Sequence, residues 1–255
     1  PAAAPAAPTT TVKIGVVAPL TGPQAHIGKD MENAVRMAAE DANAAKVMIG
    51  GNQLKFEVQS EDDQADPKMA PVVAQKLVDA KVNAVVGHFN SGTTIPASKL
   101  YSDAGIPQIS PSATNPKYTD QGFKTAFRVV ANDNQQGKVV GEYIAKDLKA
   151  KAVAIIDDRT AYGQGVADVV EKAAKAAGAN IVAREFTTDK STDFKAILTK
   201  IRGRKPDVIF FGGIDTQAGP MLQQMKGLGI KAQFVGTDGI QSSELFKLGG
   251  DAVEG

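Results

Sequence analysis

The sequence predicts an α/β protein built from two Rossmann-like lobes, each with a parallel sheet, and an interlobe cleft. Short runs of β-branched residues alternate with segments of helical period, and this alternation occurs twice along the chain. No long linker divides the two series. With 255 residues, 43% of them apolar, the chain is long enough to form two separate cores.

The first series begins with a nearly continuous apolar run over Val12–Ala18, typical of a buried parallel strand. Pro19 ends the run, and a loop over Thr21–Gly28 leads to a helix over Lys29–Ala45. The remaining expected elements alternate between strand and helix: Leu54–Gln59, Pro67–Ala80, Asn83–Gly87, Thr94–Asp103 and Ile106–Ile109. Parallel strands joined in this way predict right-handed crossovers.

The second series follows Ala126–Val130 and begins with a helix. Its expected elements alternate between helix and strand: Gln135–Lys149, Ala152–Asp157, Gly163–Ala177, Asn180–Phe186, Asp193–Arg202, Asp207–Phe211, Thr216–Leu228 and Ala232–Val235. The predicted organisation is therefore a flexible tail over residues 1–11, a first lobe over 12–129 and a second lobe over 130–255, with a hinge near Val129–Asn134.

Composition excludes several functions. Lys plus Arg number 29 and Asp plus Glu 28, so the net charge of +1 provides no broad field for nucleic acid or an anionic membrane. Trp and Cys are absent, which removes disulfides and thiolate chemistry and leaves few stacking surfaces. No apolar run approaches the roughly 20 residues that span a bilayer. We therefore expect neither a nucleic-acid partner nor membrane insertion.

The first ten residues are rich in Ala, Pro and Thr. This composition is typical of the flexible head of a mature exported protein whose signal peptide has been removed. An ordinary flexible terminus is the alternative.

Ligands of parallel α/β sheets bind beyond the carboxyl ends of the strands, where helix N-termini present unpaired N–H groups. The strand-end loops of the first lobe carry small hydroxyl side chains: Ser91, Thr93, Thr94, Ser110, Ser112 and Thr114. Those of the second lobe carry carboxylates: Asp157, Asp158, Asp215 and Asp238. The first set suits an anionic group and the second a cationic one.

Some of these candidate binding residues also have a purely structural interpretation. Ser91 and Thr93 stand where a helix opens, so they are N-caps or, together with Ser112 and Thr114, ligands of a carboxylate. Tyr162 is either a core aromatic residue or a cover over a bound molecule.

Motifs for catalysis are missing. Gly163-Gln-Gly165 lacks the third glycine of a dinucleotide fingerprint. Glu61–Asp66 lacks the spacing of a calcium loop and is better explained as a solvated turn. His26 and His88 fall in no metal or Ser/His/Asp pattern. We therefore expect no enzyme activity, no catalytic residue, no metal and no cofactor.

Five segments, taken together and in order, carry a family resemblance: Ile14–Pro23, Val86–Ser98, Ile109–Thr114, Asp158–Gly165 and Phe234–Gly239. In these segments the sequence resembles the branched-chain amino-acid-binding proteins of bacterial ABC transporters, which are type I periplasmic binding proteins. The resemblance runs from about Val12 to the last residue. It implies a periplasmic, monomeric receptor that closes like a Venus flytrap on an amino acid and delivers it to a membrane permease.

The resemblance also implies site residues. Ser91 and Thr114 match hydroxyls that bind the ligand carboxylate, assisted by backbone groups near Ser112 and Ala113. Tyr162 matches an aromatic residue that closes over the ligand, and Asp238 an acidic residue that pairs with the ammonium.

Further candidates extend this set. Phe89 and Asn90 lie in the Val86–Ser98 segment and are included as ligand-binding residues. Ile27 and Ile214 replace residues that are often aromatic in the family, which favours an apolar ligand side chain. Asp215, beside Ile214, suits the ammonium or a polar ligand equally.

The family continues beyond the point where this chain ends, so we expect a C-terminal stretch to be missing. Other readings remain open: a receptor for amides, urea or aromatic carboxylates, and the effector-binding core of a transcriptional regulator. The second is disfavoured because no helix-turn-helix precedes the first strand.

Overall fold

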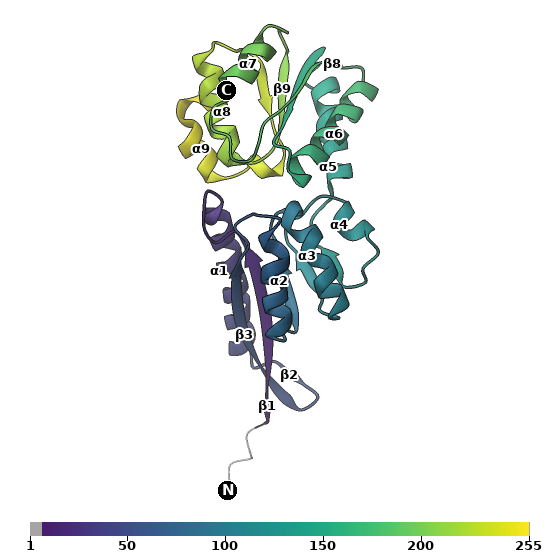
Figure 1. Ribbon diagram of the computed structural model, residues 1–255, viewed down its shortest axis with the longest axis vertical. Coiled ribbons are helices and arrows are strands. Elements are labelled where there is room, and N and C mark those ends of the chain that lie inside the picture. The colour runs from purple at the N-terminus through teal and green to yellow at the C-terminus, as the bar shows by residue number, and fades with distance from the viewer. Residues whose placement is uncertain (1–6, 255) are drawn as a thin grey trace. The chain divides into compact units, whose positions relative to one another are not determined.

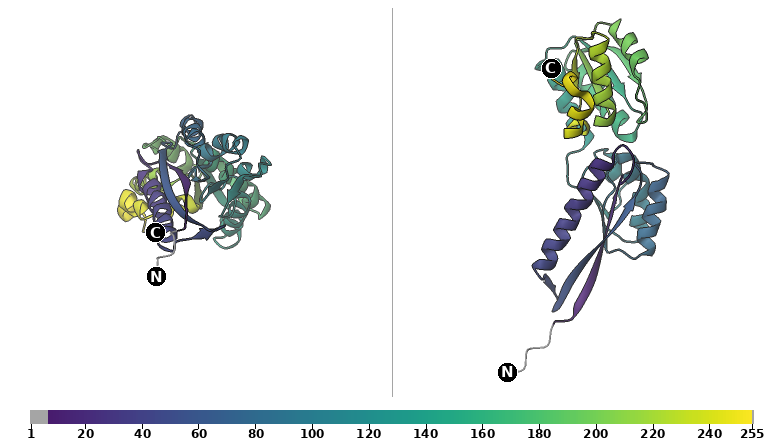
Figure 2. Two further views of the ribbon diagram at one scale, coloured as in Figure 1. Left: turned by 90° about the horizontal axis from the view of Figure 1, so that it is seen from below. Right: turned by 90° about the vertical axis from the view of Figure 1, so that its left-hand side faces the viewer.

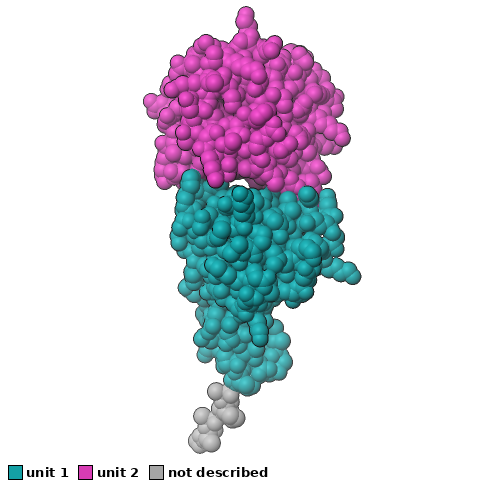
Figure 3. Space-filling view, in the orientation of Figure 1, with its two compact units in different colours: residues 1–113, 117–130 teal, residues 114–116, 131–255 magenta. Residues whose placement is uncertain are grey.

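The structure is a computed structural model that describes residues 7–254, and these divide into two compact units (Figure 3). Unit 1 consists of the residues up to Ala113 together with Lys117–Val130. Unit 2 consists of Thr114–Pro116 together with the residues from Ala131 onward. Each unit has its own sheet, so the α/β class and the two sheets expected from the sequence are confirmed.

The sheet of unit 1 has six strands in the order β2-β3-β1-β4-β5-β6. Their bounds are β1 Thr9–Ala18, β2 Met48–Ile49, β3 Asn52–Asp62, β4 Ala84–Gly87, β5 Gln108–Ser110 and β6 Ala126–Arg128. All neighbours pair in parallel except β2, which is antiparallel to β3. The short strand β2 was not predicted, because two residues before a Gly50-Gly51 turn show no alternation that could be recognised.

Helices cover both faces of this sheet. Their bounds are α1 Ala25–Ala44, α2 Met69–Asp79, α3 Ser91–Asp103 and α4 Lys117–Asp120. The right-hand view of Figure 2 shows α1 on one side of the sheet and the α2 and α3 pair on the other. The core beneath α2 and α3 is built from Val17, Val73, Leu77 and Val85.

The sheet of unit 2 has the order β10-β9-β7-β8, and its pairs are parallel. Its elements are α5 Asp133–Lys146, β7 Ala152–Asp157, α6 Ala161–Ala176, β8 Asn180–Phe186, α7 Lys195–Arg202, β9 Val208–Gly212, α8 Asp215–Gly227, β10 Gln233–Val235 and α9 Ser243–Gly249. Figure 1 shows α5 and α6 on one face and α7, α8 and α9 on the other.

Alternation along β7 divides the core of unit 2 into two layers. Val153 and Ile155 belong to the cluster under α5 and α6, whereas Ala154 and Ile156 belong to the cluster under α7 and α8. Successive side chains of a strand point to opposite faces, so both faces of β7 must be apolar. This explains the unbroken apolar run that predicted the strand.

Two glycines set the separation of α5 and α6. A Cβ at Gly137 would lie 2.8 Å from the Cβ of Val169, and one at Gly141 would lie 2.6 Å from the Cβ of Ala173. The backbones of the two helices therefore approach more closely than larger side chains allow.

Several expected boundaries were wrong. The tail was assigned to residues 1–11, but Thr9–Thr11 belong to β1 because they pair with Gln53–Lys55; residues 1–6 lie outside the described part of the chain. Helix α1 begins at Ala25, inside the expected loop. Gly28 suggested a loop, yet it allows the helix to approach Pro19, whose carbonyl oxygen would lie 2.0 Å from an added Cβ.

The segment after β10 contains helical structure that was not predicted: the 3-10 turns Asp238–Ile240 (η1) and Gly250–Ala252 (η2), and α9. Among the helices that the structure describes, none combines the length and the apolar character needed to cross a bilayer.

Candidate functional site

Two strand-end loops of unit 1 are joined by hydrogen bonds at the carboxyl ends of β4 and β5. The Ser112 hydroxyl donates to the Phe89 carbonyl oxygen at 2.6 Å. The Ser110 hydroxyl donates to the His88 carbonyl oxygen at 2.8 Å and accepts the Ala113 N–H at 2.9 Å. The structure therefore brings Phe89, Ser112 and Ala113 together, as the sequence predicted for neighbouring parallel strands.

These contacts also show how the loop amides are used. The N–H groups of Ser112 and Ala113 both point to the Ser110 oxygen, at 3.4 and 2.9 Å. A ligand carboxylate would have to share these donors with Ser110. The role of Ser112 and Ala113 thus remains a prediction. Ser110, which the sequence placed among the hydroxyls suited to an anionic group, uses its side chain here to join the two loops.

Ser91 is the first residue of α3 and is 2% exposed. The N-cap of that helix is Asn90, so the alternative in which Ser91 and Thr93 are N-caps is wrong. Thr93 and Thr94 instead donate their hydroxyls to the Asn90 carbonyl oxygen, at 3.1 and 2.8 Å. The helix begins earlier than the expected Thr94 because Asn90 has an extended backbone from which Ser91 starts the first turn.

Asn90 is held by a contact from outside its own loop. Its side-chain amide donates to Gln24 Oε1 at 2.8 Å, while its Oδ1 is buried without a hydrogen-bond partner among the described residues. A buried acceptor of this kind is costly unless it is satisfied. A donor group of a ligand, or a water molecule, could satisfy Asn90 Oδ1 by a hydrogen bond.

In unit 2, Tyr162 and Asp238 meet although 76 positions separate them. The Tyr162 hydroxyl donates to Asp238 Oδ1 at 2.7 Å and lies 2.6 Å from Thr237 Oγ1. The N–H of Gly239 donates to the same phenolic oxygen at 3.1 Å. Burial, followed by the negative charge of Asp238, raises the pKa of Tyr162 well above its usual value, so the phenol stays protonated and can donate.

The packing of Tyr162 supports its interpretation as a core aromatic residue, and its role as a cover over a bound molecule stays a prediction. Its ring packs against the core cluster beneath α5 and α6, while its hydroxyl bonds to Thr237 and Asp238. Asp238 is held from a further side by Gln136 of α5, whose Oε1 accepts the Asp238 N–H at 3.1 Å. Thr237 lies in the Phe234–Gly239 motif, but no pattern in the sequence pointed to Gln136.

Burial distinguishes the four carboxylates that the sequence placed at the strand ends of unit 2. Asp157 and Asp158 are each 3% exposed and Asp215 is fully buried, whereas Asp238 is exposed. Asp157 pairs with Arg184 at 2.8 Å, and Asp158 accepts the N–H and the hydroxyl of Thr160. Asp238 is therefore the carboxylate of this set that is accessible to a cation.

Asp215 has a structural contact of its own. The Ser242 hydroxyl donates to Asp215 Oδ2, and the same hydroxyl oxygen accepts the N–H of Leu245, which caps α9. Asp215 therefore links the start of α8 to the start of α9. Its role toward a ligand ammonium stays a prediction.

The other expected site residues are placed as follows. Thr114 belongs to unit 2, not to the unit that contains Ser91, and its buried hydroxyl oxygen has no hydrogen-bond partner among the described residues. Its carbonyl oxygen accepts the N–H of Asp133 at 2.9 Å. Ile27 is half-buried in α1, and Ile214 is 7% exposed at the N-cap of α8.

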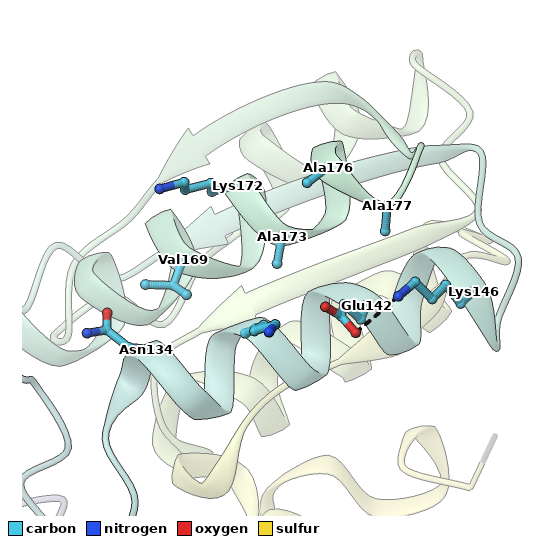
Figure 4. A pocket seen from close by; sticks show the side chains of 9 residues that line it. Asn134, Glu142, Lys146, Val169, Lys172, Ala173, Ala176 and Ala177 are labelled. Atoms are coloured by element: carbon cyan, nitrogen blue, oxygen red, sulfur yellow. Dashed lines mark hydrogen bonds and ion pairs between the residues drawn. The ribbon is translucent and has the colours of Figure 1, made fainter.

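A surface groove of about 440 Å³ lies between α5 and α6 (Figure 4). Ala173, Ala176 and Ala177 line its α6 side, and the Glu142–Lys146 ion pair, at 3.1 Å, lies on α5. None of the predicted site residues lines it, so the groove is a separate feature of the surface. Within residues 7–254 no group of three or more acidic or histidine side chains is arranged to hold a metal ion.

Two sheets that are parallel apart from β2, each covered by helices, make this an α/β protein with polar groups at the carboxyl ends of its strands. It belongs to the periplasmic binding protein family, whose model matches residues 11–255.

Two curated relatives are similar to this chain over most of its length. The chain is 44% identical over 235 residues to an amino acid binding protein of Pseudomonas aeruginosa, covering 92% of this chain and 62% of that protein. It is 41% identical to Leu/Ile/Val-binding protein homolog 1 of Brucella abortus, covering 96% of this chain and 65% of that protein. The chain thus spans 62 and 65% of the length of these two curated relatives.

A solved structure agrees with the sequence relatives. The branched-chain amino acid transporter substrate binding protein LivJ of Streptococcus pneumoniae, in complex with isoleucine, superposes with a TM-score of 0.84. The two sequences are 33% identical, and the match covers 94% of this chain and 68% of that one. The expected resemblance to branched-chain amino-acid-binding proteins is confirmed.

Proposed function

We propose that this protein is an extracytoplasmic solute-binding protein that captures an aliphatic amino acid and delivers it to the permease of an ABC transporter. The observation that carries the proposal is Asp238, an exposed residue whose carboxylate accepts the Tyr162 hydroxyl at 2.7 Å and whose backbone N–H donates to Gln136 Oε1 at 3.1 Å. A fixed, accessible carboxylate is the group that an α-ammonium requires.

A second set of residues is proposed to recognise the α-carboxylate of the amino acid. Ser91 and Thr114 would bind the α-carboxylate. The loop with Phe89 and Asn90 and the loop with Ser112 and Ala113 would shape the surface around it. Hydroxyls and backbone amides are the usual donors to a carboxylate. The buried Thr114 hydroxyl, which lacks a partner among the described residues, supports its assignment to the ligand.

An aliphatic ligand side chain is favoured by Ile27 and Ile214, whose apolar surfaces suit leucine, isoleucine or valine. The Brucella abortus relative is named for these three amino acids, and the Streptococcus pneumoniae structure contains isoleucine. Binding without chemical conversion, export to the periplasm and a monomeric state complete the proposal.

Isothermal titration calorimetry with leucine, isoleucine, valine, leucinamide, urea and 4-hydroxybenzoate tests the proposal. We expect saturable heat with at least one branched-chain amino acid and markedly weaker binding of leucinamide, which lacks the carboxylate. Preferential binding of urea or 4-hydroxybenzoate would instead support a receptor for amides or aromatic carboxylates. The absence of binding by all three of these amino acids would overturn the proposal.

A further inference from the structure

Three polar side chains form a hydrogen-bonded chain inside unit 1. His88 Nδ1 lies 2.8 Å from Asp63 Oδ2, and His88 Nε2 lies 3.2 Å from the hydroxyl of Tyr101. All three residues are fully buried. His88 follows β4, Asp63 follows β3, and Tyr101 lies on α3, so the chain connects two strand ends with a helix.

Burying an acid and an imidazole is costly unless their hydrogen-bonding groups are satisfied, and an apolar core needs neither. Here the partners are complete. Asp63 Oδ1 accepts the N–H of Ala65 at 3.1 Å, and its Oδ2 is paired with His88 Nδ1. The other ring nitrogen of His88 is paired with the Tyr101 hydroxyl. The contacts on both sides fix the orientation of the imidazole ring.

The backbone of His88 is the shared anchor of the two loops described above. Its carbonyl oxygen accepts the hydroxyl of Ser110 at 2.8 Å and lies 3.0 Å from Thr94 Oγ1, whose single proton it shares with the Asn90 carbonyl oxygen. Ser110 in turn holds the N–H of Ala113, and the next carbonyl, that of Phe89, accepts the hydroxyl of Ser112. A displacement of His88 therefore moves both the start of α3, where Ser91 lies, and the loop after β5.

We infer that His88, held by Asp63 and Tyr101, is a positioning residue for the carboxylate-binding loops. This inference rests on the proposed function and deepens it. The ring does not touch the ligand; it acts by holding its own carbonyl where Thr94 and Ser110 can reach it. Preorganised donors bind a charged group better than donors that must first be ordered, so loss of the ring should weaken recognition of the carboxylate in particular.

The test compares two ligands that differ at the carboxylate. Dissociation constants for leucine and leucinamide are measured by calorimetry for the wild type, His88→Ala and His88→Asn. We expect the preference for leucine over leucinamide to fall by roughly tenfold in His88→Ala, which corresponds to the loss of one hydrogen bond to a charged group. Asn retains a donor near Nδ1 for Asp63, so His88→Asn should recover part of the preference.

Asn43→Ala is the matched control. Asn43 joins α1 to β3 through two hydrogen bonds with the Phe56 backbone, at 2.9 and 2.7 Å, and has no contact with the His88 chain. Its loss should lower stability while leaving the ratio of the two dissociation constants unchanged. If His88→Ala behaves in the same way, with equal losses for both ligands, His88 is merely structural and the inference is overturned.

Tyr101→Phe keeps the inference testable if His88→Ala does not fold. It removes only the hydroxyl that bonds to Nε2, and we expect a change of the same sign, by roughly threefold. An unchanged ratio in this variant would contradict the inference.

If the wild type binds leucine and the variants keep the wild-type preference for leucine over leucinamide, this inference alone fails. If the wild type binds no amino acid, the proposed function fails and the inference with it.

Discussion

The phenolic oxygen of Tyr162 lies 2.7 Å from Asp238 Oδ1, which joins the start of α6 to the turn after β10. The same oxygen is 2.6 Å from Thr237 Oγ1 and accepts the Gly239 N–H. Because Asp238 is otherwise exposed, these contacts restrict a side chain that would be free to move in solvent. The pair is the best-defined part of the proposed ammonium site.

Replacing Asp238 with Asn removes the charge and keeps the shape of the side chain. We expect leucine affinity to fall by roughly 10- to 100-fold, since a hydrogen bond to a charged group contributes about 1.5–3 kcal/mol. Calorimetry measures the change. Asp251→Asn, at another exposed carboxylate of unit 2, is the control and should leave affinity intact. Equal affinity in both variants would exclude Asp238 from the ammonium site.

Tyr162→Phe removes the hydroxyl that holds Asp238 and retains the ring that packs on the core. We expect a smaller loss of leucine affinity, about fivefold, because one hydrogen bond contributes about 1 kcal/mol. Tyr143→Phe, on the exposed surface of α5, serves as the comparison. A Tyr162→Phe variant that binds as tightly as the wild type would show that Asp238 needs no such support.

Asp158 should make stability depend on pH. Burial is the main reason that its pKa rises from 3.8 to about 6 in the folded protein. The folded state binds the Asp158 proton more tightly than the unfolded state does. The protonated carboxyl therefore adds its full contribution to the free energy of unfolding below pH 4, and this contribution is lost as the pH rises through about 6.

Asp158→Asn removes this titration while Oδ1 still accepts from Thr160. Relative to the wild type, the variant should gain about 2–3 kcal/mol of unfolding free energy between pH 4 and pH 7. Urea denaturation over this range measures the difference. Parallel pH profiles for the two proteins would show that Asp158 does not titrate there.

Gly141→Ala tests the close packing of α5 on α6. The new Cβ would lie 2.6 Å from the Ala173 Cβ and 2.7 Å from the Val170 carbonyl oxygen, so the helices must separate. We expect a loss of about 1–3 kcal/mol in unfolding free energy.

Gly227→Ala is the matched control for this prediction. Nothing lies within 4 Å of a Cβ at that helical position, so the substitution should be neutral or stabilise the protein by up to about 1 kcal/mol. Thermal or chemical unfolding that shows the same stability for both variants would contradict the packing argument.

The strands of this protein were largely predictable because their burial leaves a local trace. Strands β7 and β8 occupy the expected residues. For β7 the reason is that apolar side chains are required on both faces of a central parallel strand. Helix starts were less predictable. Gly28 signals a loop by its type, yet the helix passes through it because the Pro19 carbonyl oxygen occupies the space that a side chain would need.

The sequence by itself determined the fold class, the alternation of elements and the family, because hydrophobic period and contiguous motifs are local properties. It also placed hydroxyls and carboxylates at strand ends. Only the tertiary structure decided which of them are accessible: Asp158 and Asp215 are buried, while Asp238 is exposed and joined to Tyr162. Burial and contact between distant residues depend on how the strands are ordered in the sheet, and no segment of the chain encodes that alone.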